Sequence, residues 1–266
     1  MRLPGLVATD LDGTLLRSDG TVSAYTRAVL AALDERGVPV VFVTARPLRW
    51  MDPLWPMVGG HGLAIVSNGA ILYDVAARQV REVSGIEAEA GLALCTAISE
   101  AVPGAAFALE CLSGIKRDES FLEPGHVPED SPVGSLTELW SEPAVKLMVR
   151  HEAMTDPVSF RGAVVAAVGG AAVATWSGER LVEISAAGVT KAATLARLCA
   201  ELGVTAEDVI AFGDMPNDLA MLEWAGRSYA MTGADPAVLD VADHQAPGND
   251  EDGVATVLAA TFELGL

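Results

Sequence analysis

Short apolar runs that end at polar loops recur near both ends of the chain. The first helical pattern, over residues 23–36, starts at Ser23, a good N-cap residue, and stops at Gly37. Continuous apolar runs cover residues 6–9, 38–43, 63–66 and 209–212. Short apolar runs bounded by polar loops are typical of buried strands in a parallel sheet. Strand and helix alternate in this way in doubly wound folds. The sequence therefore predicts an α/β fold with a doubly wound, Rossmann-like parallel sheet.

The middle of the chain has a different pattern of predicted helices and strands. Two helix-like stretches there alternate with shorter strand-like ones, and a loop rich in proline, glycine and acidic residues separates them. We interpret residues 76–179 as an inserted α+β domain. The α/β domain then consists of residues 1–75 and 180–266, and its second part begins with a strand at residues 181–184.

The charge of the chain excludes some classes of partner. Among 266 residues, 36 are acidic and 17 are Lys or Arg, which gives a net charge of −19. Such a surface repels nucleic acids and anionic membranes, so we expect neither as a partner. Three widely spaced cysteines and the lack of a long apolar segment predict a soluble cytoplasmic protein. Oligomeric state cannot be deduced from these features.

Two carboxylates follow the first predicted strand. Asp10 and Asp12 are two positions apart, so in an extended segment they lie on the same side. A hard cation with oxygen ligands relieves their mutual repulsion, and Gly13 lets the backbone turn sharply after them. The alternative is an ordinary turn rich in Asp and Gly.

Single polar residues follow other predicted strands or begin a helix. Thr44 ends the second strand, and it could be a simple loop hydroxyl. Lys191 lies in the first turn of a helix capped by Thr190, where the helix dipole disfavours a cation. This placement suggests a nearby anion, although a solvated surface lysine is the alternative.

The segment after the strand at residues 209–212 is Gly213-Asp214-Met215-Pro216-Asn217-Asp218. Asn217 or Asp218 could simply cap the next helix, but capping leaves Asp214 unexplained. Open α/β sheets bind ligands at the edge formed by the carboxyl ends of their strands. We therefore expect these polar segments to converge there.

Together these segments resemble the four motifs of the haloacid dehalogenase superfamily of phosphatases. The large insertion, and Ser67-Asn68-Gly69-Ala70 after the third strand, resemble its Cof-type branch. One departure is Ala45, where the family commonly has glycine after the threonine of the second motif.

The resemblance implies a role for each motif residue. Asp10 would be the nucleophile that forms an aspartyl-phosphate, and Asp12 would protonate the leaving oxygen and then activate water. Thr44 and Lys191 would bind the phosphoryl group. Mg²⁺ would be held by Asp10, Asp214 and the backbone carbonyl of Asp12. The remaining candidates are Asn68 and Asn217 for phosphate or substrate, with Gly13, Arg46 and Asp218 in supporting roles.

The expected function is that of a Mg²⁺-dependent phosphatase. Its substrates would be small phosphate monoesters, such as sugar phosphates, and the inserted domain would select among them. A phosphatase specific for a glycosyl phosphate or a mannosyl-phosphoglycerate is an alternative, and a non-catalytic sensor of a phosphorylated ligand is one of another class. Polar candidates for the selective surface of the insert are Glu110, Lys116, Arg117 and His126.

Overall fold

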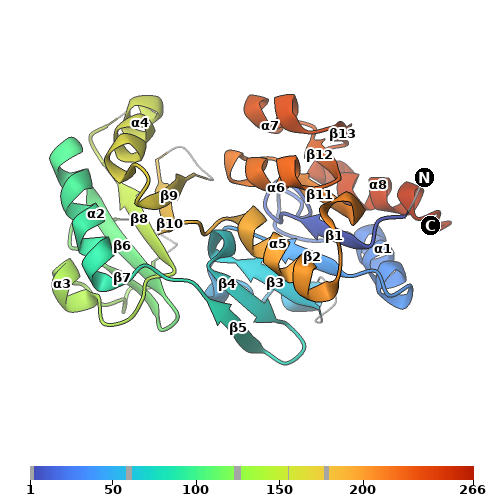
Figure 1. Cartoon of the computed structure of the whole chain (residues 1–266), viewed down its shortest axis with the longest axis horizontal. Helices are drawn as coiled ribbons and strands as arrows, with labels where there is room; N and C mark the ends of the chain where they lie inside the picture. Colours follow the sequence, from blue (N-terminus) through green and yellow to red (C-terminus); the bar gives the residue numbers. More distant parts are fainter. Residues whose placement is uncertain (1–2, 58–61, 123–126, 155, 177–179) are drawn as a thin grey trace. The chain divides into compact units, whose positions relative to one another are not determined.

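The chain folds into two compact units, shown in Figure 1 as a computed structural model. It describes residues 3–57, 62–122, 127–154, 156–176 and 180–266. The first unit comprises Met1–Glu82 and Thr190–Leu266, and the second comprises Val83–Val189. The second unit is thus an insertion in the first.

The first unit is built on an eight-stranded sheet. Counted from one edge, the first six strands, β13 to β3 in sheet order, pair in parallel. Among them, β1 lies between β11 and β2. β4 then pairs antiparallel with β3, and β5 borders β4. In sheet order the strands are β13 (His244–Ala246), β12 (Arg227–Met231), β11 (Val209–Gly213), β1 (Leu6–Thr9), β2 (Val40–Val43), β3 (Leu63–Val66), β4 (Ile71–Asp74) and β5 (Gln79–Val83).

Helices cover both faces of this sheet. Three helices, α5 (Lys191–Leu202), α6 (Leu219–Trp224) and α7 (Pro236–Val241), pack on one face over alternate strand residues such as Ala8 and Ala211. The intervening strand residues face the other side, where α1 (Ala24–Glu35) and α8 (Gly253–Thr261) contact each other and the sheet. This doubly wound arrangement is the α/β fold predicted from the sequence.

Local sequence explains where two of these helices begin. The Ser23 side chain accepts a hydrogen bond from the Thr26 amide at the start of α1, and the Thr190 side chain accepts one from the Ala193 amide at the start of α5. The second cap fixes the turn that carries Lys191. Short 3₁₀ turns occur at Leu48–Trp50, Trp55–Met57, Ser67–Gly69, Ala206–Asp208, Pro216–Asp218 and Asn249–Glu251.

The second unit is an α+β structure with a five-stranded sheet whose paired strands all run antiparallel. Two of its helices, α2 (Ala88–Ala101) and α4 (Pro157–Val168), pack together over one face of the sheet, and a third, α3, spans Leu136–Leu139. In sheet order the strands are β7 (Gly114–Arg117), β6 (Ala106–Cys111), β8 (Lys146–Arg150), β10 (Val182–Ala186) and β9 (Ala172–Thr175).

The structure corrects the expected position of one strand. The strand predicted at residues 181–184 was assigned to the parallel core, but β10 pairs antiparallel with β8 and β9 in the inserted unit. Its apolar residues Val182 and Ile184 face the helices, while Glu183 and Ser185 face the other way. The insertion therefore runs from Val83 to Val189 instead of 76–179. Within the described part of the chain, no helix is both long and apolar enough to cross a membrane.

Candidate active site

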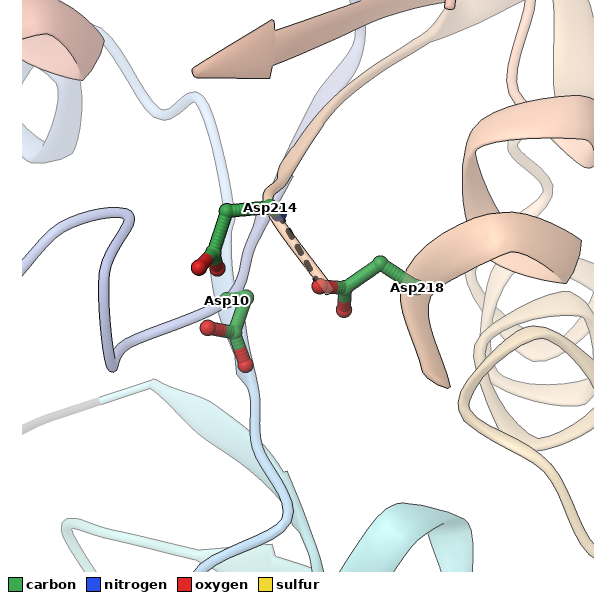
Figure 2. A group of neighbouring side chains, drawn as sticks. All are labelled: Asp10, Asp214 and Asp218. Carbon is green, nitrogen blue, oxygen red and sulfur yellow. Dashed lines mark hydrogen bonds between the residues drawn. The ribbon is translucent and has the colours of Figure 1, made fainter. Parts of the chain in front are cut away.

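Three aspartates gather at the carboxyl ends of the central strands. Asp10 follows β1, whereas Asp214 and Asp218 belong to the loop that follows β11. Figure 2 shows their side chains converging, and one carboxylate oxygen from each lies within 4.8 Å of the others. Since β1 and β11 are parallel neighbours, their ends bring residues more than 200 positions apart in the chain to one place.

Lys191 provides the positive charge within this cluster. Its Nζ donates hydrogen bonds of 2.6 Å to Asp10 Oδ1 and of 2.6 Å to Asp218 Oδ1. The lysine side chain is only 1% exposed, so both ion pairs are shielded from solvent. Gly69 makes this placement possible, because a Cβ at residue 69 would lie 2.3 Å from the carbonyl oxygen of Thr190. The third strand's loop therefore packs directly on the start of α5.

Asp218 holds the loop that carries Asp214. While its Oδ1 binds Lys191, its Oδ2 accepts hydrogen bonds from the backbone amides of Asp214 and Met215, at 3.1 Å each. Figure 2 shows the bond from the Asp214 amide. Both oxygens are thus already engaged by protein groups. Asp218 therefore anchors this loop, and the supporting role expected of it in the site remains a prediction.

The turn after Asp12 fits tightly against Asp214. Gly13 has a φ of +75°, and a Cβ there would lie 2.3 Å from Asp214 Oδ2. The hydroxyl of buried Thr14 donates a 2.8 Å hydrogen bond to Asp214 Oδ1. Thr14 was not among the predicted site residues. Its position directly after Gly13, in the turn that follows Asp12, could have indicated that its hydroxyl lies near the carboxylates.

The cluster carries more negative charge than one lysine can balance. Burial, together with repulsion from Asp218 and Asp214, raises the pKa of Asp10 well above its ordinary value even though Lys191 opposes the shift. Burial and then repulsion from Asp218 raise the pKa of Asp214 to about 7. Burial alone would lower the pKa of Lys191, but attraction to Asp10 and Asp218 outweighs it, so that pKa lies above its ordinary value. The lysine therefore stays cationic.

A divalent cation suits this charge imbalance. Hard ions such as Mg²⁺ prefer oxygen ligands and commonly use one or two carboxylates. Asp10 and Asp214 have carboxylate oxygens close together, and their raised pKa values reflect burial first and then repulsion from neighbouring aspartates, which a cation would relieve. The chemistry of this donor set therefore fits the metal expected from the sequence.

Thr44 is fully buried at the end of β2, in a backbone framework formed with the end of β3. Its amide donates to Ile65 O at 2.8 Å, and its carbonyl accepts from the Asn68 amide at 3.0 Å. The hydroxyl oxygen accepts a 3.0 Å hydrogen bond from the Arg46 amide. Because that oxygen already accepts, the hydroxyl proton remains available for donation to another acceptor.

Asp12 lies outside the three-aspartate cluster and pairs with Arg46. The guanidinium donates from Nε to Asp12 Oδ2 at 2.7 Å and from Nη2 to Asp12 Oδ1 at 2.6 Å. The Asp12 side chain is 55% exposed and the Arg46 side chain 24%. The hydrogen bond to Asp12 raises the pKa of Arg46. This partner of Asp12 was not predicted.

The two asparagine candidates contact each other. Asn217 Nδ2 donates a 3.1 Å hydrogen bond to Asn68 Oδ1. Asn68 and its neighbour Ser67 both adopt positive φ angles, +55° and +52°, which are uncommon for residues other than glycine. Among the described residues, the buried Ser67 Oγ and Asn217 Oδ1 have no hydrogen-bond partner. Backbone strain with unsatisfied polar atoms is typical of ligand sites.

The candidates in the inserted unit make contacts within that unit. Lys116 Nζ donates to Ser141 Oγ and to Glu142 Oε1, both at 2.9 Å, and Arg117 donates to backbone carbonyls of Asp118 and Phe121. Glu110 is buried in β6. His126 lies outside the described residues, as does His61 in the first unit. A selective role for these residues remains a prediction.

Comparison with known proteins agrees with this geometry. A sequence model of haloacid dehalogenase-like hydrolases matches residues 7–258. The 5-amino-6-(5-phospho-D-ribitylamino)uracil phosphatase of Bacillus subtilis is 29% identical over 278 residues, covering 98% of this chain and 98% of its own. The pyridoxal phosphate phosphatase of Escherichia coli is 29% identical over 94% of this chain and 96% of its own.

A solved structure supports the fold. A protein from Streptococcus mutans UA159 superimposes with a TM-score of 0.84 at 24% identity, over 98% of this chain and 99% of that protein. At such identity the likeness concerns the fold alone. It agrees with the predicted α/β fold.

Proposed function

Because the chain belongs to the haloacid dehalogenase-like hydrolases and is a phosphatase of that family, we propose that it hydrolyses small phosphate monoesters through an aspartyl-phosphate on Asp10. The observation that carries the proposal is the buried contact of Asp10 with Lys191, beside Asp214, at the carboxyl end of the central strand. A carboxylate held beside a cation and a second metal-binding carboxylate is suited to attack an anionic phosphoryl group.

Mg²⁺ is the cofactor in this proposal. Asp10, Asp214 and the backbone carbonyl of Asp12 would hold it, with Thr14 orienting Asp214 through its hydrogen bond. When bound, the ion balances the charge of the phosphoryl group and of the carboxylates around it.

In the first half-reaction, a carboxylate oxygen of Asp10 attacks phosphorus, and the bond from phosphorus to the ester oxygen breaks. Asp12 donates a proton to the departing oxygen, so that an alcohol leaves. Lys191 stabilises negative charge on the transferring group, and the free hydroxyl proton of Thr44 is available to one of its oxygens. Asn68, with its positive φ, and Asn217, whose Oδ1 has no hydrogen-bond partner among the described residues, contact the bound phosphate or substrate.

In the second half-reaction, water replaces the alcohol. Asp12, now without its proton, accepts one from water as the water oxygen bonds to phosphorus. The bond from Asp10 to phosphorus breaks, which frees inorganic phosphate and restores the carboxylate. One residue thus serves first as acid and then as base.

The proposed substrates are small phosphorylated metabolites. The two similar phosphatases act on different compounds, a ribitylaminouracil phosphate and pyridoxal phosphate, so the shared feature is the phosphoryl group. We assign the choice of leaving group to the inserted unit, and sugar phosphates remain candidates. The three cysteines are free, which fits the cytoplasmic location predicted from the sequence.

Phosphate release tests the proposal. Wild-type protein is incubated with p-nitrophenyl phosphate, sugar phosphates and pyridoxal phosphate, with Mg²⁺ or with EDTA. We expect metal-dependent turnover that Asp10→Asn lowers by about 10⁴-fold or more, since loss of a nucleophile removes the covalent route. Asp19→Asn, a change at an exposed aspartate in the same segment, should leave it intact. Turnover that survives Asp10→Asn would refute the aspartyl-phosphate.

A further inference from the structure

The pairing of Asp12 with Arg46 is a feature of the site that the steps above do not use. The two residues come from different loops, after β1 and β2, and their side chains meet through two parallel hydrogen bonds of 2.7 and 2.6 Å. A guanidinium that binds both carboxylate oxygens fixes the plane of the carboxylate as well as its position. Asp12 is 55% exposed, so without such a partner its side chain would be free to rotate.

Arg46 is itself held in place by its backbone. Its amide donates to Thr44 Oγ1 at 3.0 Å, and its carbonyl accepts from the Ser67 amide at 2.9 Å. The arginine is therefore fixed to the two loops that end β2 and β3. Asp12, which pairs with Arg46, is thereby linked to the same loop backbone that carries the Thr44 hydroxyl.

The two cations of the site serve different carboxylates. Lys191 is buried and binds Asp10 and Asp218, whereas Arg46 is partly exposed and binds Asp12. Exposed ion pairs contribute about 0–1 kcal/mol to folding, so this pair is not explained by stability.

We propose that Arg46 is the positioning residue for Asp12, holding its carboxylate in the orientation needed for proton transfer. This inference rests on the proposed function of Asp12 as acid and base. When the ester bond breaks, the proton of Asp12 goes to the leaving oxygen, and when water attacks, a water proton goes to Asp12. Both proton transfers need one carboxylate oxygen of Asp12 aimed at the reacting oxygen. The attack of Asp10 on phosphorus does not depend on the orientation of Asp12.

The role predicts a dependence on the leaving group. A nitrophenolate leaves without protonation, whereas the alkoxide of a sugar phosphate needs an acid. Loss of Arg46 should therefore slow formation of the aspartyl-phosphate from an alkyl ester and spare its formation from an aryl ester. Hydrolysis of the intermediate should be slowed for both, because water always needs the base.

The experiment compares wild type with Arg46→Ala and Arg46→Lys in rapid-mixing kinetics with Mg²⁺. For Arg46→Ala we expect the first step with a sugar phosphate to fall by about tenfold to a hundredfold, within the range of acid–base catalysis. With 2,4-dinitrophenyl phosphate we expect an unchanged first step followed by slow turnover, seen as a burst of phenolate. Arg46→Lys should restore only part of the rate, because an ammonium group cannot donate two parallel hydrogen bonds to one carboxylate. Added guanidinium should partly rescue Arg46→Ala.

Arg49→Ala provides a matched control. Arg49 lies in the same segment, but its guanidinium carbon stacks 4.9 Å from the ring centroid of Trp50. This variant should behave as wild type in both steps. If Arg46→Ala slows the aryl and alkyl first steps equally, or only raises KM, the arginine binds the phosphate or the substrate and the proposal is wrong.

A second measurement does not depend on turnover. In ¹⁵N-labelled protein, Asp12→Asn should shift the Nε–H resonance of Arg46, and Asp19→Asn should not. An unshifted resonance would overturn the pairing itself. If instead wild type hydrolyses no ester, the proposed function fails, whereas an active wild type with an unaffected Arg46→Ala refutes only the role of Arg46.

Discussion

The two units of this protein both bury charged side chains, but they balance them differently. In the inserted unit, Lys146 and Glu183 are both buried and form a direct ion pair between adjacent strands. In the first unit, Lys191 pairs with both Asp10 and Asp218, with Asp214 beside them. Balanced charge of the first kind is compatible with a purely structural role. Surplus negative charge is relieved either by protonation or by a bound cation, and so it suits a cation-binding site.

The two sheets explain this difference. In the inserted unit, Lys146 of β8 and Glu183 of β10 lie within neighbouring antiparallel strands, where cross-strand pairing is the natural outcome. In the parallel sheet, the charged residues lie just beyond the strands, where loops from β1 and β11 meet at one edge. A parallel sheet therefore gathers like charges from distant parts of the chain.

The strongest test of the comparison is removal of the lysine from the acidic cluster. Lys191→Met leaves two buried carboxylates without their cation and removes charge stabilisation from the transferring phosphoryl group. We expect turnover to fall by about 10³-fold. The free energy of unfolding without metal should fall by about 3–5 kcal/mol, as expected for a broken buried pair. Phosphate release and urea denaturation measure the two effects.

A matched control exists in the inserted unit. Lys116→Met removes a lysine that binds Ser141 and the partly exposed Glu142, whose carboxylate stays in reach of water, and it should change the free energy of unfolding by about 1 kcal/mol or less. Equal effects of the two substitutions on turnover would contradict the assignment of Lys191 to the active site.

Substitutions in the pair of Lys146 and Glu183 should lower stability without lowering turnover. Glu183→Gln removes one charge of the buried ion pair with Lys146 and should lower the free energy of unfolding by about 3 kcal/mol. The double variant Lys146→Met, Glu183→Leu should recover most of that loss, because apolar residues of similar size often replace buried ion pairs without penalty. Aryl phosphate turnover per folded molecule should be retained throughout. A double variant less stable than Glu183→Gln would show that the charges are needed for more than mutual compensation.

The sequence predicts the first unit better than the inserted one, for a physical reason. The central strands are continuous apolar runs, and α5 begins at a threonine cap, so both stand out locally. β10 instead alternates valine, glutamate, isoleucine and serine, the pattern of a sheet with helices on one face only. Its apolar residues led to its assignment to the parallel core. The short edge elements β13 and α7 were missed because three to six residues carry too little periodicity.

The site shows the same division. That Asp10, Thr44, Lys191 and Asp214 lie at one end of the parallel sheet follows from strand order, which the motifs imply. The pairing of Asp12 with Arg46, and of Asn68 with Asn217, depends on side-chain directions that no local pattern specifies. Family resemblance names the residues, but only the folded loops show which of them hold each other.

The smallest predicted effect is a dependence of stability on pH that comes from the surplus charge itself. The folded-state pKa of Asp214 is raised to about 7 from an ordinary 3.8, and that of Asp10 is raised as well. Between about pH 4 and 7 the folded, metal-free protein therefore holds protons that the unfolded chain has released. Its free energy of unfolding should fall as pH rises through this window, because stability falls with pH wherever the folded state binds more protons.

Thermal unfolding in EDTA and in Mg²⁺ measures this effect. In EDTA the Tm should drop on the order of a few degrees between about pH 4 and 7, and Asp214→Asn should flatten the slope. Carboxylates with lowered pKa, such as Asp156, lose their contribution only below about pH 4, so Asp156→Asn is a control that keeps the slope. Mg²⁺ binds the ionised carboxylates, so its stabilisation should grow as pH rises. If Asp214→Asn has the same slope as wild type, the acidic cluster is already balanced without metal, and the contrast with Lys146 and Glu183 disappears.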